Sequence, residues 1–191
     1  MEDNFNPHQS LDIIQSMIAK TKSNLGENRF YFLLWGWICF AAFLSQFFLK
    51  AILEYRHHYL VWLSTIPAMI ITIVYSSRKD KRANVKTYIG ESMGNLWMGI
   101  GISFFILSII ISNLPEGWFY AYPFFILFYG LGTFVSGRIL QFRPLMIGGI
   151  FNWILAVVCI YIPFDYQLLL GAAAIFTSYI IPGLLLKTEK S

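Results

Sequence analysis

MGNLWMGIGISFFILSIIISNL, residues 93–114, runs for 22 residues without a charged side chain. A helix rises about 1.5 Å per residue, so this stretch is long enough to cross the hydrocarbon core of a bilayer, which is about 30 Å thick. It does not alternate polar with apolar residues, as the strands of a membrane β-barrel do. The stretch therefore predicts a membrane-spanning helix.

Five further stretches have the same character, and all 24 charged residues of the chain lie outside the six. The composition agrees, because 57% of the residues are apolar and 13% are charged, where a soluble domain carries about 25% charged residues. We therefore predict an all-α integral membrane protein with a membrane domain at 30–186. Its six expected spans are 30–49, 59–77, 93–114, 117–137, 145–163 and 166–186.

The short connections between these spans predict three helical hairpins. Two residues, 115–116, join the third span to the fourth, and 164–165 join the fifth to the sixth. Lysine and arginine predict the orientation, because cytoplasmic loops are enriched in both. With a cytoplasmic N-terminus, 12 of the 14 cations fall inside, and only Lys50 and Arg56 fall outside. We expect a multi-pass protein of the cell (inner) membrane with both termini cytoplasmic.

The two flanks of the membrane domain are short. Residues 1–29 form a cytoplasmic segment in which Leu11, Ile14 and Ile18 recur at helical spacing. This pattern predicts an amphipathic helix at about 10–22, which either rests on the membrane surface or docks a partner. Residues 187–191 form a cytoplasmic tail. The net charge of +4 follows from the topology, so nucleic-acid binding is not expected.

Two hairpins resemble each other in sequence. Gly101 and the residues that follow it to Pro115 align without gaps to Gly149 and the residues that follow it to Pro163, with five of 15 positions identical. A duplicated hairpin and a chance match in apolar sequence both remain open. Prolines fall within the second, fourth and sixth spans, where kinks would open space between helices. These are Pro67, Pro123 and Pro182.

The spans lack the residues that membrane catalysis uses. None contains His, Asp, Glu or Lys, so we expect no catalytic site, no cofactor and no enzyme activity. In the loop at 50–58, Glu54, His57 and His58 share a helical spacing suited to a metal. Two adjacent histidines cannot point the same way, however, and the preferred interpretation is a set of interfacial polar residues without a metal.

Asn152 is the most distinctive polar residue within a span. It belongs to a stripe of small and polar residues with Gly148, Ala156 and Cys159, which lets helices approach closely. An unpaired amide in hydrocarbon is costly, so Asn152 must face protein, water or ligand, most simply Ser178 or Tyr179 of the sixth span.

Tyr129 and Tyr179 lie near the centres of the fourth and sixth spans. Asn152, Tyr129 and Tyr179 are therefore the candidate ligand-binding residues, and interhelical hydrogen bonding is the alternative explanation for all three.

These features favour a small carrier, permease subunit or binding module for a small, mainly apolar ligand. Charged substrates are disfavoured, because no span offers a countercharge. The alternative is a structural or regulatory partner that docks a cytoplasmic protein through the N-terminal helix and the basic loop at 78–92. The expected partners are the lipid bilayer, an apolar small molecule or lipid, and a cytoplasmic protein or a second copy of the chain.

Overall fold

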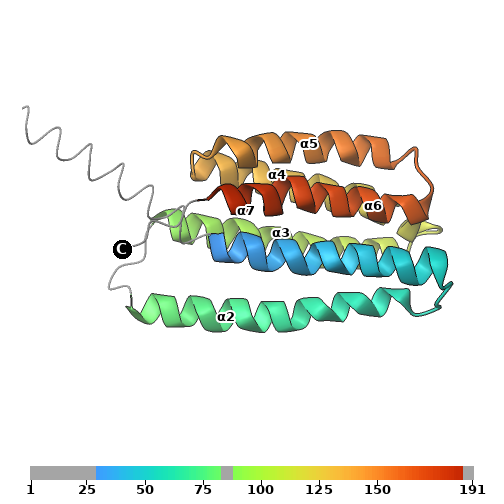
Figure 1. Cartoon of the computed structure of the whole chain (residues 1–191), viewed down its shortest axis with the longest axis horizontal. Helices are drawn as coiled ribbons and strands as arrows, with labels where there is room; N and C mark the ends of the chain where they lie inside the picture. The colour runs from blue at the N-terminus through green and yellow to red at the C-terminus, as the bar shows by residue number, and fades with distance from the viewer. Residues whose placement is uncertain (1–28, 83–87, 187–191) are drawn as a thin grey trace, which may run out of the picture.

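The computed structural model describes residues 29–82 and 88–186, and every regular element in these residues is a helix (Figure 1). Five helices are long and apolar enough to cross a membrane, which confirms the all-α fold and is compatible with a multi-pass membrane protein. They are Arg29–Ile52, His58–Arg78, Ile89–Ser112, Gly117–Ile139 and Phe164–Leu185. The predicted amphipathic helix at about 10–22 and the tail 187–191 lie outside the described residues.

Short 3-10 and π turns interrupt several of these helices. The first helix ends in the π turn η1, Phe48–Ile52. The remaining elements are η2 (His58–Ser64), α2 (Thr65–Arg82), α3 (Tyr88–Ser112), η3 (Gly117–Tyr120), α4 (Ala121–Ile139), α5 (Arg143–Cys159), α6 (Phe164–Ile175), η4 (Phe176–Ile180) and α7 (Ile181–Leu185). The elements α6, η4 and α7 form one continuous helix, in which η4 is a π turn just before Pro182. Proline has no N–H to donate to the carbonyl of Ser178, so the regular helical pattern is lost there.

The expected fifth span, 145–163, is shorter as a helix than the sequence suggests. Helix α5 has 17 residues and ends at Cys159, four residues before Pro163. The residue before a proline is pushed out of the helical region, and the chain turns over residues 160–163 before α6 begins. Helix α5 therefore falls below the length of the five candidate membrane helices.

Two of the three prolines lie where a 3-10 turn passes into an α-helix. Pro67 and Pro123 are each the third residue of their α-helix, after the 3-10 turns η2 and η3. Proline is tolerated in a first turn, because the N–H groups there have no partner within the helix. A kink at these two prolines that opens space between helices therefore stays a prediction.

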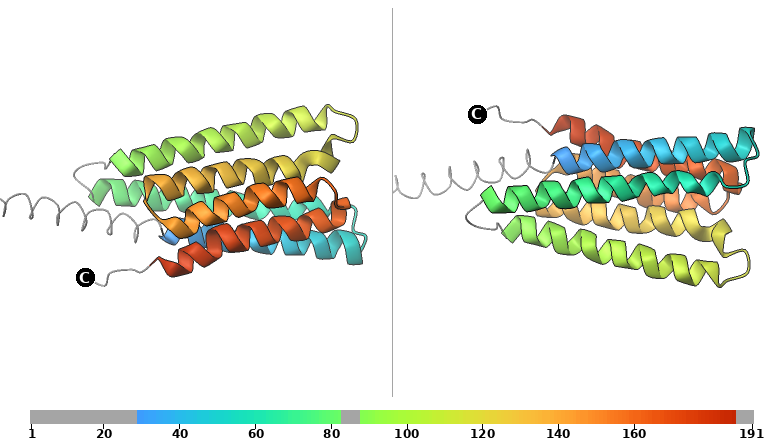
Figure 2. Two further views of the ribbon diagram at one scale, coloured as in Figure 1. Left: turned by 90° about the horizontal axis from the view of Figure 1, so that it is seen from above. Right: turned by 90° about the horizontal axis from the view of Figure 1, so that it is seen from below.

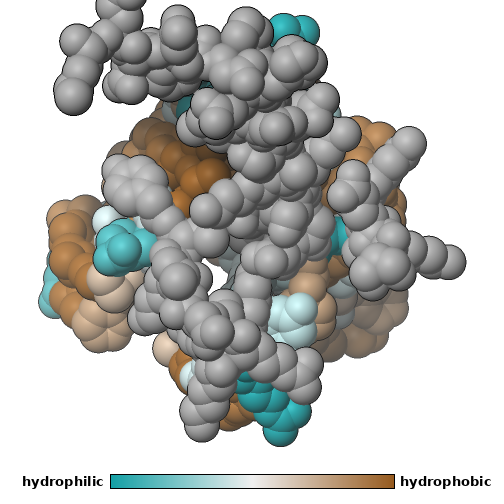
Figure 3. Space-filling view, turned by 90° about the vertical axis from the view of Figure 1, so that its left-hand side faces the viewer, coloured by the Kyte–Doolittle hydropathy of each residue, from teal (hydrophilic) through white to brown (hydrophobic). Residues whose placement is uncertain are grey.

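All the helices run along the long axis of the molecule (Figures 1 and 2). The first helix begins, and α7 ends, at the same end of the molecule as the C-terminal end of α2 and the N-terminal end of α3 (Figure 1). In the view onto this end, brown hydrophobic residues occupy the sides of the molecule, with some teal hydrophilic residues among them (Figure 3).

Among the elements from η1 to α7, the closest packing is between α4 and α5. A Cβ atom added to Gly149 would lie 2.7 Å from the backbone nitrogen of Phe134 and 2.8 Å from the carbonyl oxygen of Gly130. On the other face of α5, a Cβ atom at Gly148 would lie 2.8 Å from Cα of Ser178. The whole predicted stripe is buried: Gly148, Asn152, Ala156 and Cys159. Small residues thus let α5 pack backbone to backbone against α4 and η4.

The matched glycines of the two similar hairpins lie in different surroundings. Gly149 is enclosed by α4, whereas no atom lies within 4 Å of a Cβ added to Gly101. The sequence similarity therefore has no counterpart in the packing at this position.

Helices α2 and α3 are attached loosely. In their apolar windows 6% and 11% of the residues are buried, against 44% for the helix that contains α4 and 56% for the one that contains α6. Helix α2 meets the first helix through the Trp35 indole, whose Nε1 donates to Oγ1 of Thr72 at 3.0 Å. Ala68, one turn earlier on α2, is fully buried. Among the described residues, α2 does not pack extensively against α3 or α4. A space therefore remains between these helices.

Candidate functional site

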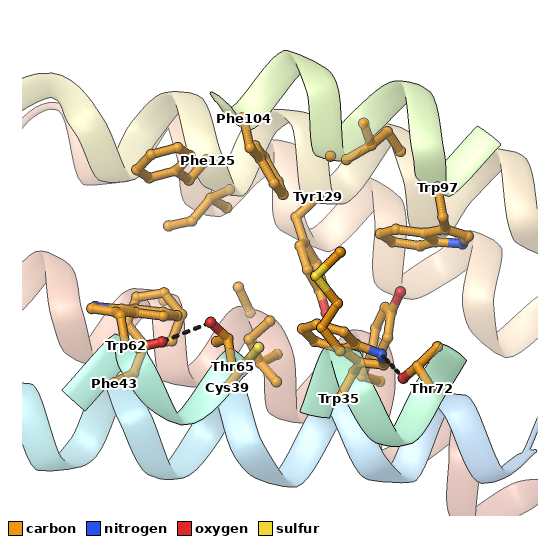
Figure 4. A pocket seen from close by; sticks show the side chains of 18 of the residues that line it. Trp35, Cys39, Phe43, Trp62, Thr65, Thr72, Trp97, Phe104, Phe125 and Tyr129 are labelled. Atoms are coloured by element: carbon orange, nitrogen blue, oxygen red, sulfur yellow. Dashed lines mark hydrogen bonds between the residues drawn. The ribbon is translucent and has the colours of Figure 1, made fainter. Parts of the chain in front are cut away.

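A cavity of about 1860 Å³ lies between the first helix, α2, α3, α4 and α6 (Figure 4). Of the described residues, none from α5 lines it. Drug-sized pockets usually measure about 300–1,000 Å³, so this cavity has room for a larger or a second ligand.

The cavity extends along most of the bundle. On α3 its lining residues run from Ile89 to Ser108, which at 1.5 Å per residue spans about 29 Å. That length matches the thickness of the hydrocarbon core, about 30 Å. The lining therefore reaches from the end where the first helix begins and α7 ends to the opposite end, where Lys50 and His58 contribute.

Aromatic side chains form much of the wall (Figure 4). The labelled ones come from four helices: Trp35, Phe43, Trp62, Trp97, Phe104, Phe125 and Tyr129. Indole N–H groups are already paired within the protein, since Trp97 Nε1 donates to Oγ of Ser136 at 3.2 Å and Trp35 donates to Thr72. Trp35 and Trp97 therefore present apolar ring surface to the cavity, while their indole donors are paired within the protein.

The three predicted site residues divide into two groups. Tyr129 and Tyr179 both line the cavity, with their ring centroids 4.8 Å apart, and Trp97 packs edge-on against each of them. Asn152 does not line it. Its amide is fully buried between α5 and η4, where Nδ2 donates to Oγ of Ser178 at 3.1 Å, one of the two partners that the sequence suggested.

Replacing Asn152 with leucine should change the free energy of unfolding little, by about 0.6 kcal/mol, the typical value of an interhelical hydrogen bond in a membrane. Ser178 keeps its own bond to the carbonyl oxygen of Ala174 at 2.6 Å, and the Oδ1 atom of Asn152, which has no partner among the described residues, disappears. Unfolding by SDS titration measures the change. Asn152→Asp is the control for sensitivity and should destabilise strongly, because a carboxyl group replaces the buried amide. If Asn152→Leu lowered the free energy of unfolding by about 2 kcal/mol, the Asn152–Ser178 bond would be stronger than expected and this prediction would be wrong.

Gln46 is the main polar residue of the cavity that the sequence analysis missed. It is buried near the end of the first helix, and its Oε1 accepts hydrogen bonds from Trp62 Nε1 at 2.7 Å and from the Tyr122 hydroxyl at 3.0 Å. Its Nε2 pairs with Nδ1 of His58 at 3.1 Å. Gln46 thus joins the first helix to η2 and α4. The available signal was an amide in the otherwise apolar stretch 30–49, and such residues rarely lack a partner.

Paired charges flank Gln46 at the same end of the cavity. Lys50 Nζ lies 2.6 Å from Oδ1 of Asp165 and 3.7 Å from the centre of the Phe164 ring. The ammonium group is thereby neutralised by a carboxylate and covered by an aromatic face. This end of the cavity is polar but carries little net charge.

The candidate metal ligands of the outer loop have other partners. His58 bonds to Gln46, and Nδ1 of His57 pairs with the Tyr59 hydroxyl at 3.1 Å. Glu54 adopts a left-handed backbone conformation, with φ 48°, at the turn. Within the described residues there is no group of three His, Cys, Asp or Glu that could hold a metal ion.

Replacing Gln46 with leucine should lower the free energy of unfolding by about 2 kcal/mol, because the Trp62 and Tyr122 donors lose their common acceptor. Gln167→Leu is the matched control, since Gln167 is equally buried but makes one recorded bond, from Nε2 to the carbonyl oxygen of Ile162. SDS titration of both variants makes the comparison. Equal losses would mean that the Gln46 network does not stabilise the bundle.

Comparisons with protein family models, with curated proteins and with solved structures find no match for this chain.

Proposed function

We propose that this protein binds an apolar ligand in its intramembrane cavity, as a non-enzymatic carrier, permease subunit or binding module. The cavity is the observation that carries the proposal, since a space of about 1860 Å³, lined mainly by aromatic and aliphatic side chains, lies between the helices. An apolar space in a membrane protein is favourable to fill, because its lining atoms otherwise lack contacts.

The distribution of charge supports an apolar rather than a charged ligand. Among the described lining residues, Lys50 and His58 lie at one end and Glu91 at the other, so the middle of the cavity has hydroxyl, thiol and ring groups but no charge. Lys50 is moreover paired with Asp165. A charged molecule that entered the cavity would lose its hydration and would find no countercharge there.

The proposed ligand class is the one expected from the sequence, but the set of binding residues is different. Tyr129 and Tyr179 stay in the proposed site, and Trp35 and Trp97 join them, whereas Asn152 is assigned to helix packing. The docking alternative rests largely on residues 1–28 and 83–87, which lie outside the described chain, so no observation here favours it.

We also propose that the chain crosses the membrane six times, in three hairpins, with both termini in the cytoplasm. Three facts support this topology: the split of 12 cations to two, the position of the start of the first helix and the end of α7 at one end of the molecule (Figure 1), and the apolar character of α5. Helix α5 is about 26 Å long at 1.5 Å per residue. A thinned bilayer accommodates a helix of that length at modest cost.

Reporter fusions test the topology. A fusion at Glu116 or at Asp165 should read outside the cytoplasm, and one at Lys81 should read inside. Glu116 lies just before η3 and Asp165 in the first turn of α6, both at the end where the sequence places few cations. Alkaline phosphatase and green fluorescent protein fusions give opposite signals at each position and control for expression. An external signal at Lys81 would exclude the proposed orientation.

Bound molecules test the function. The protein is purified in mild detergent and extracted with organic solvent, and the released molecules are quantified by mass spectrometry per mole of protein. Gly101→Phe should lose a species that the unaltered protein retains, because Gly101 lines the cavity with open space around its Cβ position. Gly99→Phe is the matched control, with equally open space on the same helix but outside the cavity lining. Identical extracts from all three proteins would refute the proposal.

A further inference from the structure

The size and shape of the cavity narrow the class of ligand, if the proposed function is correct. A cavity of about 150 Å³ holds one benzene molecule, which corresponds to about 25 Å³ per carbon atom. At that density 1860 Å³ accommodates about 74 carbon atoms. That number is close to four fatty acyl chains, far more than a small metabolite contains.

The length of the cavity leads to the same class. Its lining on α3 covers about 29 Å, the thickness of both leaflets of the hydrocarbon core, about 30 Å in total. Polar side chains are found toward both ends: His58 and Tyr59 at one, Glu91 and Asn95 at the other. Between them the wall is formed mainly by rings and aliphatic chains (Figure 4). Polar ends and an apolar middle match the head groups and the acyl chains of two lipids, one in each leaflet, whose chains meet at the centre of the membrane.

The cavity is also accessible from the side. Three lining residues on the facing helices α2 and α3 are well exposed: Ile66, Met69 and Phe105, the last of these at 68%. The described parts of α2 and α3 do not pack extensively against each other. In a membrane the medium beside these helices is hydrocarbon, so an acyl chain reaches the cavity without crossing water.

We propose that the ligand of this cavity is bilayer glycerolipid, one molecule from each leaflet, whose acyl chains enter sideways between α2 and α3. The chains lie against Trp35 and Trp97, and the head groups stay at the two polar ends. The inference rests on the proposed function and adds to it the ligand class, the route of entry and the orientation of the bound molecule.

Quenching of tryptophan fluorescence tests this proposal, since bromine atoms quench tryptophan only at close contact. The full-length protein is reconstituted into vesicles of phosphatidylcholine brominated near the methyl ends of its chains, and into unbrominated vesicles as reference. Trp97 is one turn from Gly101 on α3, and both line the cavity. Phenylalanine at position 101 therefore displaces a chain from Trp97 without adding a fluorophore.

We expect the brominated lipid to quench the unaltered protein and Gly99→Phe to the same extent, and Gly101→Phe to a smaller extent. Gly94 is a second lining position with open space, so Gly94→Phe should also be quenched less. This variant keeps the test valid if Gly101→Phe fails to fold. Circular dichroism checks that all four proteins have the same helix content. Equal quenching in all four would overturn the assignment to lipid.

The extraction experiment separates this inference from the function on which it rests. Glycerolipid lost from the Gly101→Phe extract, together with reduced quenching, supports both. A species lost from that extract that is not a glycerolipid, with quenching unchanged, leaves the proposed function standing and overturns the lipid assignment. No lost species and no change in quenching would refute both proposals.

Discussion

Replacing Gly149 with leucine should disrupt the α4–α5 pair and lower the free energy of unfolding by more than about 3 kcal/mol, the upper end of the usual cost of overpacking. The reason is geometric. A single added carbon at Gly149 already falls 2.7 Å from the Phe134 backbone, and backbone atoms cannot move aside as a flexible side chain does. The variant must therefore separate two helices that pack closely against each other.

Gly101→Leu is the matched control for this effect. Gly101 aligns with Gly149 in the two similar hairpins, yet it has no atom within 4 Å of its Cβ position. Leucine there should leave stability unchanged or raise it slightly, because glycine in a helix interior is unfavourable by about 1 kcal/mol. SDS titration of both variants measures the difference. Similar losses at the two positions would contradict the packing described here and would support an equivalent role of the two hairpins.

Replacing Ala68 with phenylalanine should detach α2 from the first helix while the rest of the bundle stays folded. Ala68 is the one buried residue at positions 65–78 of α2, and the hydrogen bond between Trp35 of the first helix and Thr72 lies one turn further along α2. A phenyl ring at this buried position costs about 1–3 kcal/mol through overpacking. Since α2 buries so little else, we expect the whole helix to move.

Hydrogen–deuterium exchange locates that effect. Peptides covering 65–78 should exchange faster in Ala68→Phe, whereas peptides from α4 and α5 should keep their protection. The variant should also lose the ligand of the cavity, since α2 forms one of its walls. Ile71→Phe is the control, because Ile71 lies exposed on the same helix. Loss of protection in α4 and α5 as well would show that α2 is part of one cooperative bundle.

The candidate site was only partly predictable from the sequence. Tyr129 and Tyr179 were chosen for their depth in the spans, and both line the cavity. Asn152 was chosen for the cost of burying an amide, and that reasoning correctly led to Ser178 but equally fits a residue that only joins helices. Gln46 was missed because its importance comes from Trp62 and Tyr122, which lie 16 and 76 residues away along the chain.

The sequence by itself determined the membrane class, the helices and the stripe of small residues on α5. These are local properties, because hydrocarbon offers no hydrogen-bond partner and each apolar stretch must satisfy its backbone as a helix on its own. Only the tertiary structure decided which helices pack closely and which leave a cavity. That choice depends on contacts between residues that are distant along the chain, such as Gly149 with Gly130 and Trp35 with Thr72. Lipid-facing and cavity-facing residues are equally apolar, so their sequence pattern cannot separate them.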